Sequence, residues 1–298
     1  MSSQKFSRRS AIKFIGAASV AMGISGASGY AYAFEIEPRW LAREHIQIPI
    51  KSLPRTFRDF KLVCLSDFHH ESGDGVKFPE RVVQSANRLK PDLICLLGDY
   101  VFSDAQSITE LASVLAKLEA PHGVYAVLGN HDYWTDPEAV RQGLAEIGIT
   151  VLINQGLPIN RGGDAIFLAG LDDGWSGEPD LEETLKSAPP DVPVIVLMHE
   201  PDFADEIAKT GRVDLQLSGH SHGGQVKPLF FEAPVRPAFA RNYTAGHYPV
   251  GQMHLYVSRG VGTIPPRLRF NCRPEISEIV LIPYTHPASS VSEFALES

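Results

Sequence analysis

Short apolar runs alternate along the chain with stretches whose apolar residues recur at helical spacing. Each run is five or six residues long, rich in Val, Ile and Leu, and is followed within a few residues by Gly, Asp, Asn or His. Runs of this length and composition are typical of strands that are buried on both faces of a sheet. We predict such strands over residues 61–66, 92–97, 123–128, 194–198 and 213–217.

The stretches between these runs predict amphipathic helices. One covers 79–89, and a second begins near Ile108, where Leu repeats at helical spacing. Two more, over 137–147 and 202–209, follow the Asp-Pro and Pro-Asp pairs that often start helices. Strands and helices that alternate in this way indicate an α/β fold with helices packed on largely buried sheets.

The amino terminus has the features of an export signal. Ser7-Arg8-Arg9-Ser10 and Lys13 precede a weakly apolar, Gly- and Ala-rich run that extends to Tyr32, and Ala31-Tyr32-Ala33 offers a small-x-small cleavage motif. This resembles a twin-arginine signal peptide. We therefore divide the chain into a signal at 1–33, one domain at 34–287 and a frayed, small-residue tail at 288–298. Retention of the uncut signal as a membrane anchor stays open, whereas cleavage would leave no stable membrane span.

Net charge and cysteine placement exclude some classes of function. The signal holds four of the 27 Lys and Arg residues, so its removal leaves 23 basic against 35 acidic residues and a net charge of −12. A chain this acidic repels polyanions, and we expect no nucleic-acid partner. Cys64 and Cys95 fall inside predicted core strands, and the odd total of three gives no disulfide framework.

Metal-ligating residue types follow five of the apolar runs. Because an open α/β sheet gathers the loops at the carboxyl ends of its strands, these residues are expected to meet in one crevice. Carboxylates and imidazoles in such numbers suit Mn, Zn or Fe ions, and two ions can clamp a reacting phosphoryl group. The five groups are Asp67-Phe68-His69, Gly98-Asp99, Gly129-Asn130-His131-Asp132, His199 and Gly219-His220-Ser221-His222.

The order of these groups is similar to that of the calcineurin-like metallophosphoesterases. The resemblance implies a four-layer α-β-β-α sandwich of two mixed sheets. It also implies a centre of two divalent metal ions, with Asp99 shared between them. By the same resemblance the first ion has Asp67, His69, Asp99 and His222 as ligands, and the second has Asp99, Asn130, His199 and His220.

The local pattern also leads to an expectation about side-chain direction. Asp67 and His69 are two residues apart, as are His220 and His222. On an extended backbone such residues point to the same side, with Phe68 directed back into the core.

The reaction implied by the family is direct attack of a metal-bridging hydroxide on phosphorus. His131 matches the non-ligand position of the family motif, and we assign it to stabilising or protonating the leaving oxygen, with Asp132 orienting its ring. The alternative for His131 is a further metal ligand or a structural histidine.

Substrate contacts are expected from the region after His222. We assign Arg241, Tyr243 and Arg259 to substrate binding, because guanidinium groups suit phosphate and aromatic rings suit a flat or apolar substituent. The alternative for part of this region is a Pro-rich hairpin that packs on a sheet edge. The stretch from Ser258 to Ile276 resembles the carboxy-terminal signature of a bacterial branch, the YkuE/YaeI-type phosphodiesterases.

Three hypotheses for function follow from this sequence. The first is a phosphodiesterase, exported by the twin-arginine translocase to the periplasm or cell envelope, that acts on a small-molecule or lipid-linked phosphodiester. The second is a phosphomonoesterase or pyrophosphohydrolase of the UDP-diacylglucosamine-cleaving type that uses the same centre. The third is an envelope protein that binds metal without turnover.

Overall fold

Two six-stranded sheets form the centre of the computed structural model, which describes residues 28–228, 231 and 233–284. The first sheet has the order β1 (Ala42–Ile50), β12 (Glu275–Pro283), β2 (Phe60–Leu65), β3 (Leu93–Leu96), β4 (Val124–Ala126) and β5 (Thr150–Val151). The second has the order β10 (Gly246–Val250), β11 (Met253–Val257), β9 (Leu215–Ser218), β8 (Val194–Leu197), β7 (Asp164–Gly170) and β6 (Gln155–Arg161).

Both sheets mix parallel and antiparallel pairs. Strands β2 to β5 are parallel, and β12 runs antiparallel to β2. In the second sheet β7, β8, β9 and β11 are parallel, and the outer strands β6 and β10 are antiparallel to their neighbours. The predicted pair of mixed sheets is confirmed.

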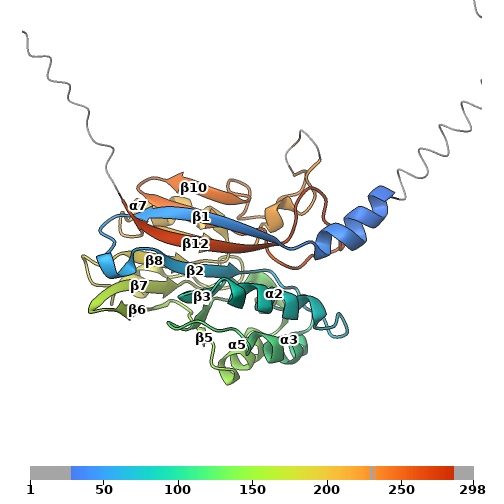
Figure 1. Ribbon diagram of the computed structural model, residues 1–298, viewed down its shortest axis with the longest axis horizontal. Helices are drawn as coiled ribbons and strands as arrows, with labels where there is room; N and C mark the ends of the chain where they lie inside the picture. The colour runs from blue at the N-terminus through green and yellow to red at the C-terminus, as the bar shows by residue number, and fades with distance from the viewer. Residues whose placement is uncertain (1–27, 229–230, 232, 285–298) are drawn as a thin grey trace, which may run out of the picture.

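Helices cover the outer faces of the sheets. Figure 1 shows α2 (Lys77–Arg88), α3 (Ile108–Leu115) and α5 (Pro137–Glu146) grouped on one flank, where they pack on the first sheet. Two shorter helices, α6 (Leu181–Leu185) and α7 (Ala204–Lys209), pack on the second sheet. Helix α4 (Asn130–Thr135) and the 3-10 turns η3 (Arg55–Phe57), η4 (Ala105–Ser107), η5 (Pro201–Phe203) and η6 (His222–Gly224) lie in the connections.

Alternation along the strands separates the layers of the core. Leu62 and Cys64 of β2 face the second sheet, where they join a buried cluster with residues such as Leu197 and Leu217. Val63 and Leu65, one residue out of phase, pack against α2, α3 and α5. Strands with apolar residues on both faces therefore hold four layers together, as the continuous apolar runs predicted.

The segment before β1 is part of this fold. It forms η1 (Tyr32–Ile36) and η2 (Glu37–Arg39). Ala33 is buried, and its carbonyl oxygen accepts a hydrogen bond from the main-chain N–H of Arg269. The predicted cleavage site after Ala33 thus lies within a packed helical turn. The twin-arginine motif and the tail at 288–298 lie outside the described residues.

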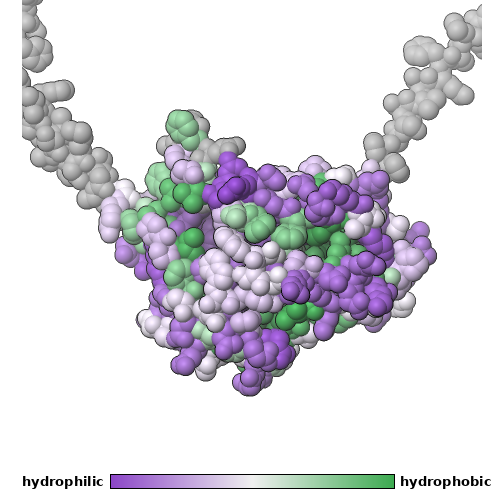
Figure 2. Space-filling model, turned by 180° about the vertical axis from the view of Figure 1, so that it is seen from behind, coloured by the Kyte–Doolittle hydropathy of each residue, from purple (hydrophilic) through white to green (hydrophobic). Residues whose placement is uncertain are grey.

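All three cysteines are buried and unpaired. Cys64 on β2 lies opposite Cys95 on β3, and both are buried thiols that form no disulfide. Cys272 is also a free thiol. Figure 2 shows a face on which hydrophilic residues predominate between separate hydrophobic patches. Among the described residues, no helix has both the length and the apolar character needed to cross a membrane.

Candidate metal centre

The carboxyl ends of five parallel strands bring the predicted ligands together. Strands β2, β3 and β4 of one sheet and β8 and β9 of the other all end within four residues of a predicted ligand. Each of the seven side chains belongs to a residue at most 4% exposed: Asp67, His69, Asp99, Asn130, His199, His220 and His222.

Five of these residues have a left-handed backbone. Asp67, His69, Asp99, His220 and His222 have φ between 46° and 67°. Such a conformation costs a non-glycine residue about 1–3 kcal/mol and is concentrated at functional sites. The expected extended backbone was therefore wrong, because each left-handed residue turns the chain sharply where an extended strand would continue. Phe68 is nevertheless buried in the core, as expected.

Asp67, His69 and His222 form one group. One ligand atom from each of them lies within 4.8 Å of those from the other two. The Nε2 atoms of His69 and His222 are 2.8 Å apart, and Nε2 of His222 is 3.4 Å from Oδ1 of Asp67. These distances place three potential ligands around one point.

Asp99, His199 and His220 form a second group by the same criterion. Nε2 of His199 is 3.2 Å from Oδ2 of Asp99, and the same oxygen is 3.4 Å from Nε2 of His69. Asp99 therefore contacts histidines of both groups, which is the position a shared ligand requires.

Unsatisfied polar atoms show that the groups fit divalent cations. Nε2 of His199, which faces Oδ2 of Asp99, and Oδ1 of Asn130 are buried and have no hydrogen-bond partner among the described residues. Native proteins rarely leave buried polar atoms unpaired, because the lost hydration costs free energy. Metal ions coordinated by side chains of these groups would offset that cost.

The charges of the site favour ionised carboxylates. Burial alone would raise the pKa of Asp99, but His199 and His69 outweigh it and hold the pKa well below its usual range. Burial lowers the pKa of His220 to about 4, with His199 adding to the effect. Anionic Asp99 and neutral His220 are the forms that coordinate metal.

His131 lies beside the first group, but Asp132 does not orient its ring. Nδ1 of His131 is 3.0 Å from the carbonyl oxygen of Phe102, which leaves Nε2 for the centre. The Asp132 carboxylate instead accepts hydrogen bonds from four main-chain N–H groups, those of Asp99, Tyr100, Val101 and Gly129. Asp132 thus ties the loop after β3 to the start of α4.

Gly129 permits this close approach of loops. A Cβ atom at this position would lie 2.4 Å from Oδ1 of Asp99 and 2.7 Å from Nε2 of His199. Any side chain there would displace two predicted ligands, so the glycine is required by space.

Two of the three predicted substrate contacts, Arg259 and Tyr243, have side chains that are paired with other residues. The Arg259 guanidinium pairs with Glu44 and Glu275, and the Tyr243 hydroxyl donates to Oδ1 of Asp205. The main-chain N–H of Arg241 donates to Asp202, and its side chain is exposed. The substrate-binding roles of these residues stay predictions.

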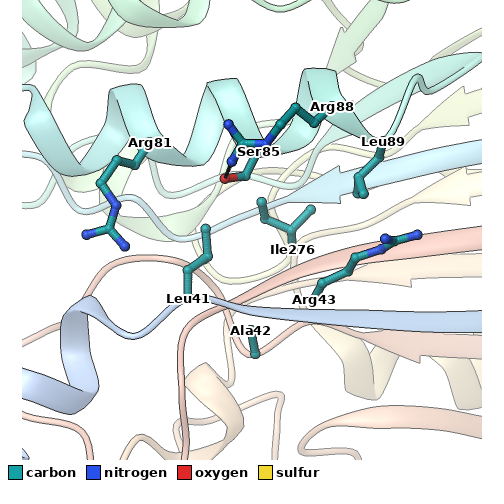
Figure 3. Close-up of a pocket in the computed structure, with 8 residues that line it drawn as sticks. All are labelled: Leu41, Ala42, Arg43, Arg81, Ser85, Arg88, Leu89 and Ile276. Carbon is teal, nitrogen blue, oxygen red and sulfur yellow. Dashed lines mark hydrogen bonds between the residues drawn. The ribbon is translucent and has the colours of Figure 1, made fainter.

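One cavity borders the first ligand group, and a larger one lies away from both groups. One of about 210 Å³ borders His69 and is lined by Phe34, Phe68 and Phe78 among others. Another of about 410 Å³ lies between α2 and the start of β1. Figure 3 shows the guanidinium groups of Arg43 and Arg81 at opposite ends of this second cavity, so they do not form one anion site.

Two tryptophans that the sequence analysis did not select also border the centre. Trp134 contacts the ring of His131, and Trp175 contacts that of His220. Trp134 follows a ligand motif by two residues, which is a weak signal. Nothing local to Trp175 points to the site, because its position depends on how distant loops meet.

Comparison with known proteins connects this geometry to a family. The family model for calcineurin-like phosphoesterases matches residues 60–224. The uncharacterized metallophosphoesterase YkuE of Bacillus subtilis is 35% identical over 285 residues, covering 93% of this chain and 98% of its own. Phosphodiesterase YaeI of Escherichia coli is 32% identical over 266 residues, covering 87% and 95%.

Proposed function

The chain belongs to the calcineurin-like phosphoesterase family, and from this premise we propose that it is an exported phosphodiesterase with two divalent metal ions in its active centre. As a member of that family it is a metal-dependent hydrolase of phosphate esters. The preference for diesters is supported by the likeness to the protein named phosphodiesterase YaeI.

The observation that carries the metal assignment is the pair of ligand groups joined by Asp99. Asp67, His69 and His222 would hold one ion, and His199, His220 and Asn130 the other. Bound cations would supply Lewis-acid stabilisation of the charge that develops on the phosphoryl oxygens. We propose Mn, Zn or Fe, since carboxylate, amide and imidazole ligands suit all three.

His131 is the chain's own group for proton transfer. Its Nδ1 is held by the Phe102 carbonyl, and one of its ring nitrogens lies within 4.8 Å of ligand atoms of His69 and Asp99. Nε2 is then free to hold a proton against the leaving oxygen of a substrate at the centre.

Export by the twin-arginine pathway to the periplasm or cell envelope is part of the proposal. It is supported by the Ser7-Arg8-Arg9-Ser10 motif and by core cysteines that need no oxidation. Replacing both arginines by lysine should abolish export of the chain by cells that have the pathway, while the protein still folds in the cytoplasm. Unchanged export of that variant would refute the route.

Hydrolysis of bis-p-nitrophenyl phosphate and p-nitrophenyl phosphate tests the substrate class. The chelated protein should be inactive, and added Mn²⁺, Zn²⁺ or Fe²⁺ should restore cleavage with a preference for the diester. A monoester preference would instead support the phosphomonoesterase alternative. Loss of activity without restoration by any metal would overturn the proposed function.

A further inference from the structure

A row of aromatic rings borders the metal centre. The ring centroids of His131 and Trp134 are 4.7 Å apart, and Trp134 meets Trp175 nearly at right angles, with centroids 5.2 Å apart. Trp175 in turn lies edge-to-face with His220 at 5.8 Å. Two indole rings thus lie between a candidate proton donor and a candidate metal ligand.

These rings are exposed although they are held in place. Trp134 is 51% exposed and Trp175 41% exposed. Nε1 of Trp134 donates to Oγ of Ser176, and the main-chain N–H of Trp175 donates to Oδ2 of Asp173, a residue that is fully buried. Ordered aromatic surface that faces solvent beside a reactive centre is available to bind a ligand.

A third ring extends the same surface. Phe239 is 38% exposed, and its ring centroid is 5.8 Å from that of Trp175. The three residues come from α4, the loop after β7 and the segment after η6. Single exposed apolar residues are ordinary, but three from separate segments that meet beside one centre form a surface.

We propose that Trp134, Trp175 and Phe239 form an aromatic subsite for a planar, uncharged substituent of the phosphate ester. The inference rests on the proposed function and names the substrate class. The planes of the two indole rings meet at 84°, so together the rings offer a face and an edge to a ligand. Aromatic groups pair in both arrangements. A phosphonate with a planar aromatic substituent should therefore bind more tightly than a phosphonate of equal charge with a methyl substituent.

The cavity beside His69 is the competing location. Phe34, Phe68 and Phe78 make part of it apolar, but Arg267 on its wall is paired with Glu71 and Asp74. The proposal favours the indoles because they contact His131 and His220, whereas the cavity reaches the centre only at His69.

Binding of phenylphosphonate and methylphosphonate to the metal-loaded protein tests the proposal without turnover. Both probes are phosphonates with one P–C bond. Phenylphosphonate has a planar ring on phosphorus where methylphosphonate has a methyl group. Isothermal calorimetry should give a phenyl preference of about tenfold or more in Kd for the unaltered chain. The preference should fall to about threefold or less in Trp134→Ala and in Trp175→Ala, and Trp134→Phe should restore most of it.

Trp40→Ala is the matched control, because Trp40 is also 51% exposed but lies against Arg273 and should leave the preference unchanged. If the tryptophan substitutions act only by disturbing the metal ligands, they should weaken the binding of both probes equally. The ratio of the two Kd values would then be unchanged, and this result would contradict the proposal. No phenyl preference in the unaltered chain, or its loss in Phe34→Ala alone, would also overturn it. If the preference behaves as expected while bis-p-nitrophenyl phosphate is not cleaved, the proposed function fails and the subsite stands.

Discussion

The Nε2 atoms of His69 and His222 face each other at 2.8 Å, while the Nδ1 atom of each ring has no partner among the described residues. Two buried imidazoles in this arrangement are poorly satisfied by the protein alone. Divalent ions coordinated by the ligand groups would offset the desolvation of these rings and of the nearby carboxylates. The stability of the fold should therefore depend on metal.

Chelation should lower the melting temperature, and Mn²⁺ or Zn²⁺ should raise it again. A ligand present at 100 times its Kd stabilises a protein by about 2.7 kcal/mol, which corresponds to about 5–10 °C for a chain of this size. Thermal unfolding of the chelated and metal-loaded protein measures this shift. Asp99→Asn is the control, since loss of the shared ligand should remove most of the metal response. An identical shift in that variant would contradict the role of Asp99.

His131→Ala should separate proton transfer from metal binding. The variant should keep both metal ions, while turnover of bis-p-nitrophenyl phosphate falls by a factor on the order of 10²–10⁴, the usual contribution of a positioned acid or base. Metal content and kcat are measured on the same preparation. Equal metal loss in His131→Ala and Asp99→Asn would make His131 a ligand.

Glu37 should anchor the amino-terminal segment to the domain. Its carboxylate is fully buried and accepts hydrogen bonds from the main-chain N–H groups of Asn271 and Cys272. Glu37→Ala leaves these donors unpaired and should lower the free energy of unfolding by about 2–3 kcal/mol. Urea denaturation measures the change. Glu35→Ala, which removes an exposed ion pair with Arg39, should have almost no effect.

Glu278 should contribute to acid sensitivity. Burial raises its pKa, but hydrogen bonds from Arg43, His45 and Lys61 outweigh this and lower the pKa below the ordinary 4.5. A carboxylate whose pKa is lowered in the folded state adds to the free energy of unfolding above about pH 4.5. This contribution is lost as the pH falls through the pKa of the folded state. Glu278→Gln should therefore lose less stability than the unaltered chain between about pH 5 and pH 3. Parallel curves of unfolding free energy against pH would contradict this.

The sequence predicts five of the strands, those whose carboxyl ends carry the candidate ligands, better than the remaining strands. The runs that lie in β2, β3, β8 and β9 are almost fully buried, so their composition alone indicates them. Strands β1 and β12 were not predicted, although they pair in parallel over nine residues. Their partners are more than 200 positions apart in sequence, and such pairing leaves no local signal.

The sequence located the strand ends at which the candidate ligands meet, but it did not indicate the backbone conformation or the rim of the site. The ligand groups follow buried strands, so the crevice could be located from strand ends. The left-handed φ of residues such as Asp67 and His220 depends on tertiary packing, which residue type does not reveal. The approach of Trp175 to His220 likewise depends on which loops meet.

Anomalous diffraction from crystals of the metal-loaded protein would locate the metal ions of the proposed dinuclear centre. We expect two metal peaks, one among Asp67, His69 and His222 and the other among Asn130, His199 and His220, with Asp99 between them. A single peak, or two peaks at residues outside these groups, would contradict a dinuclear centre at this site.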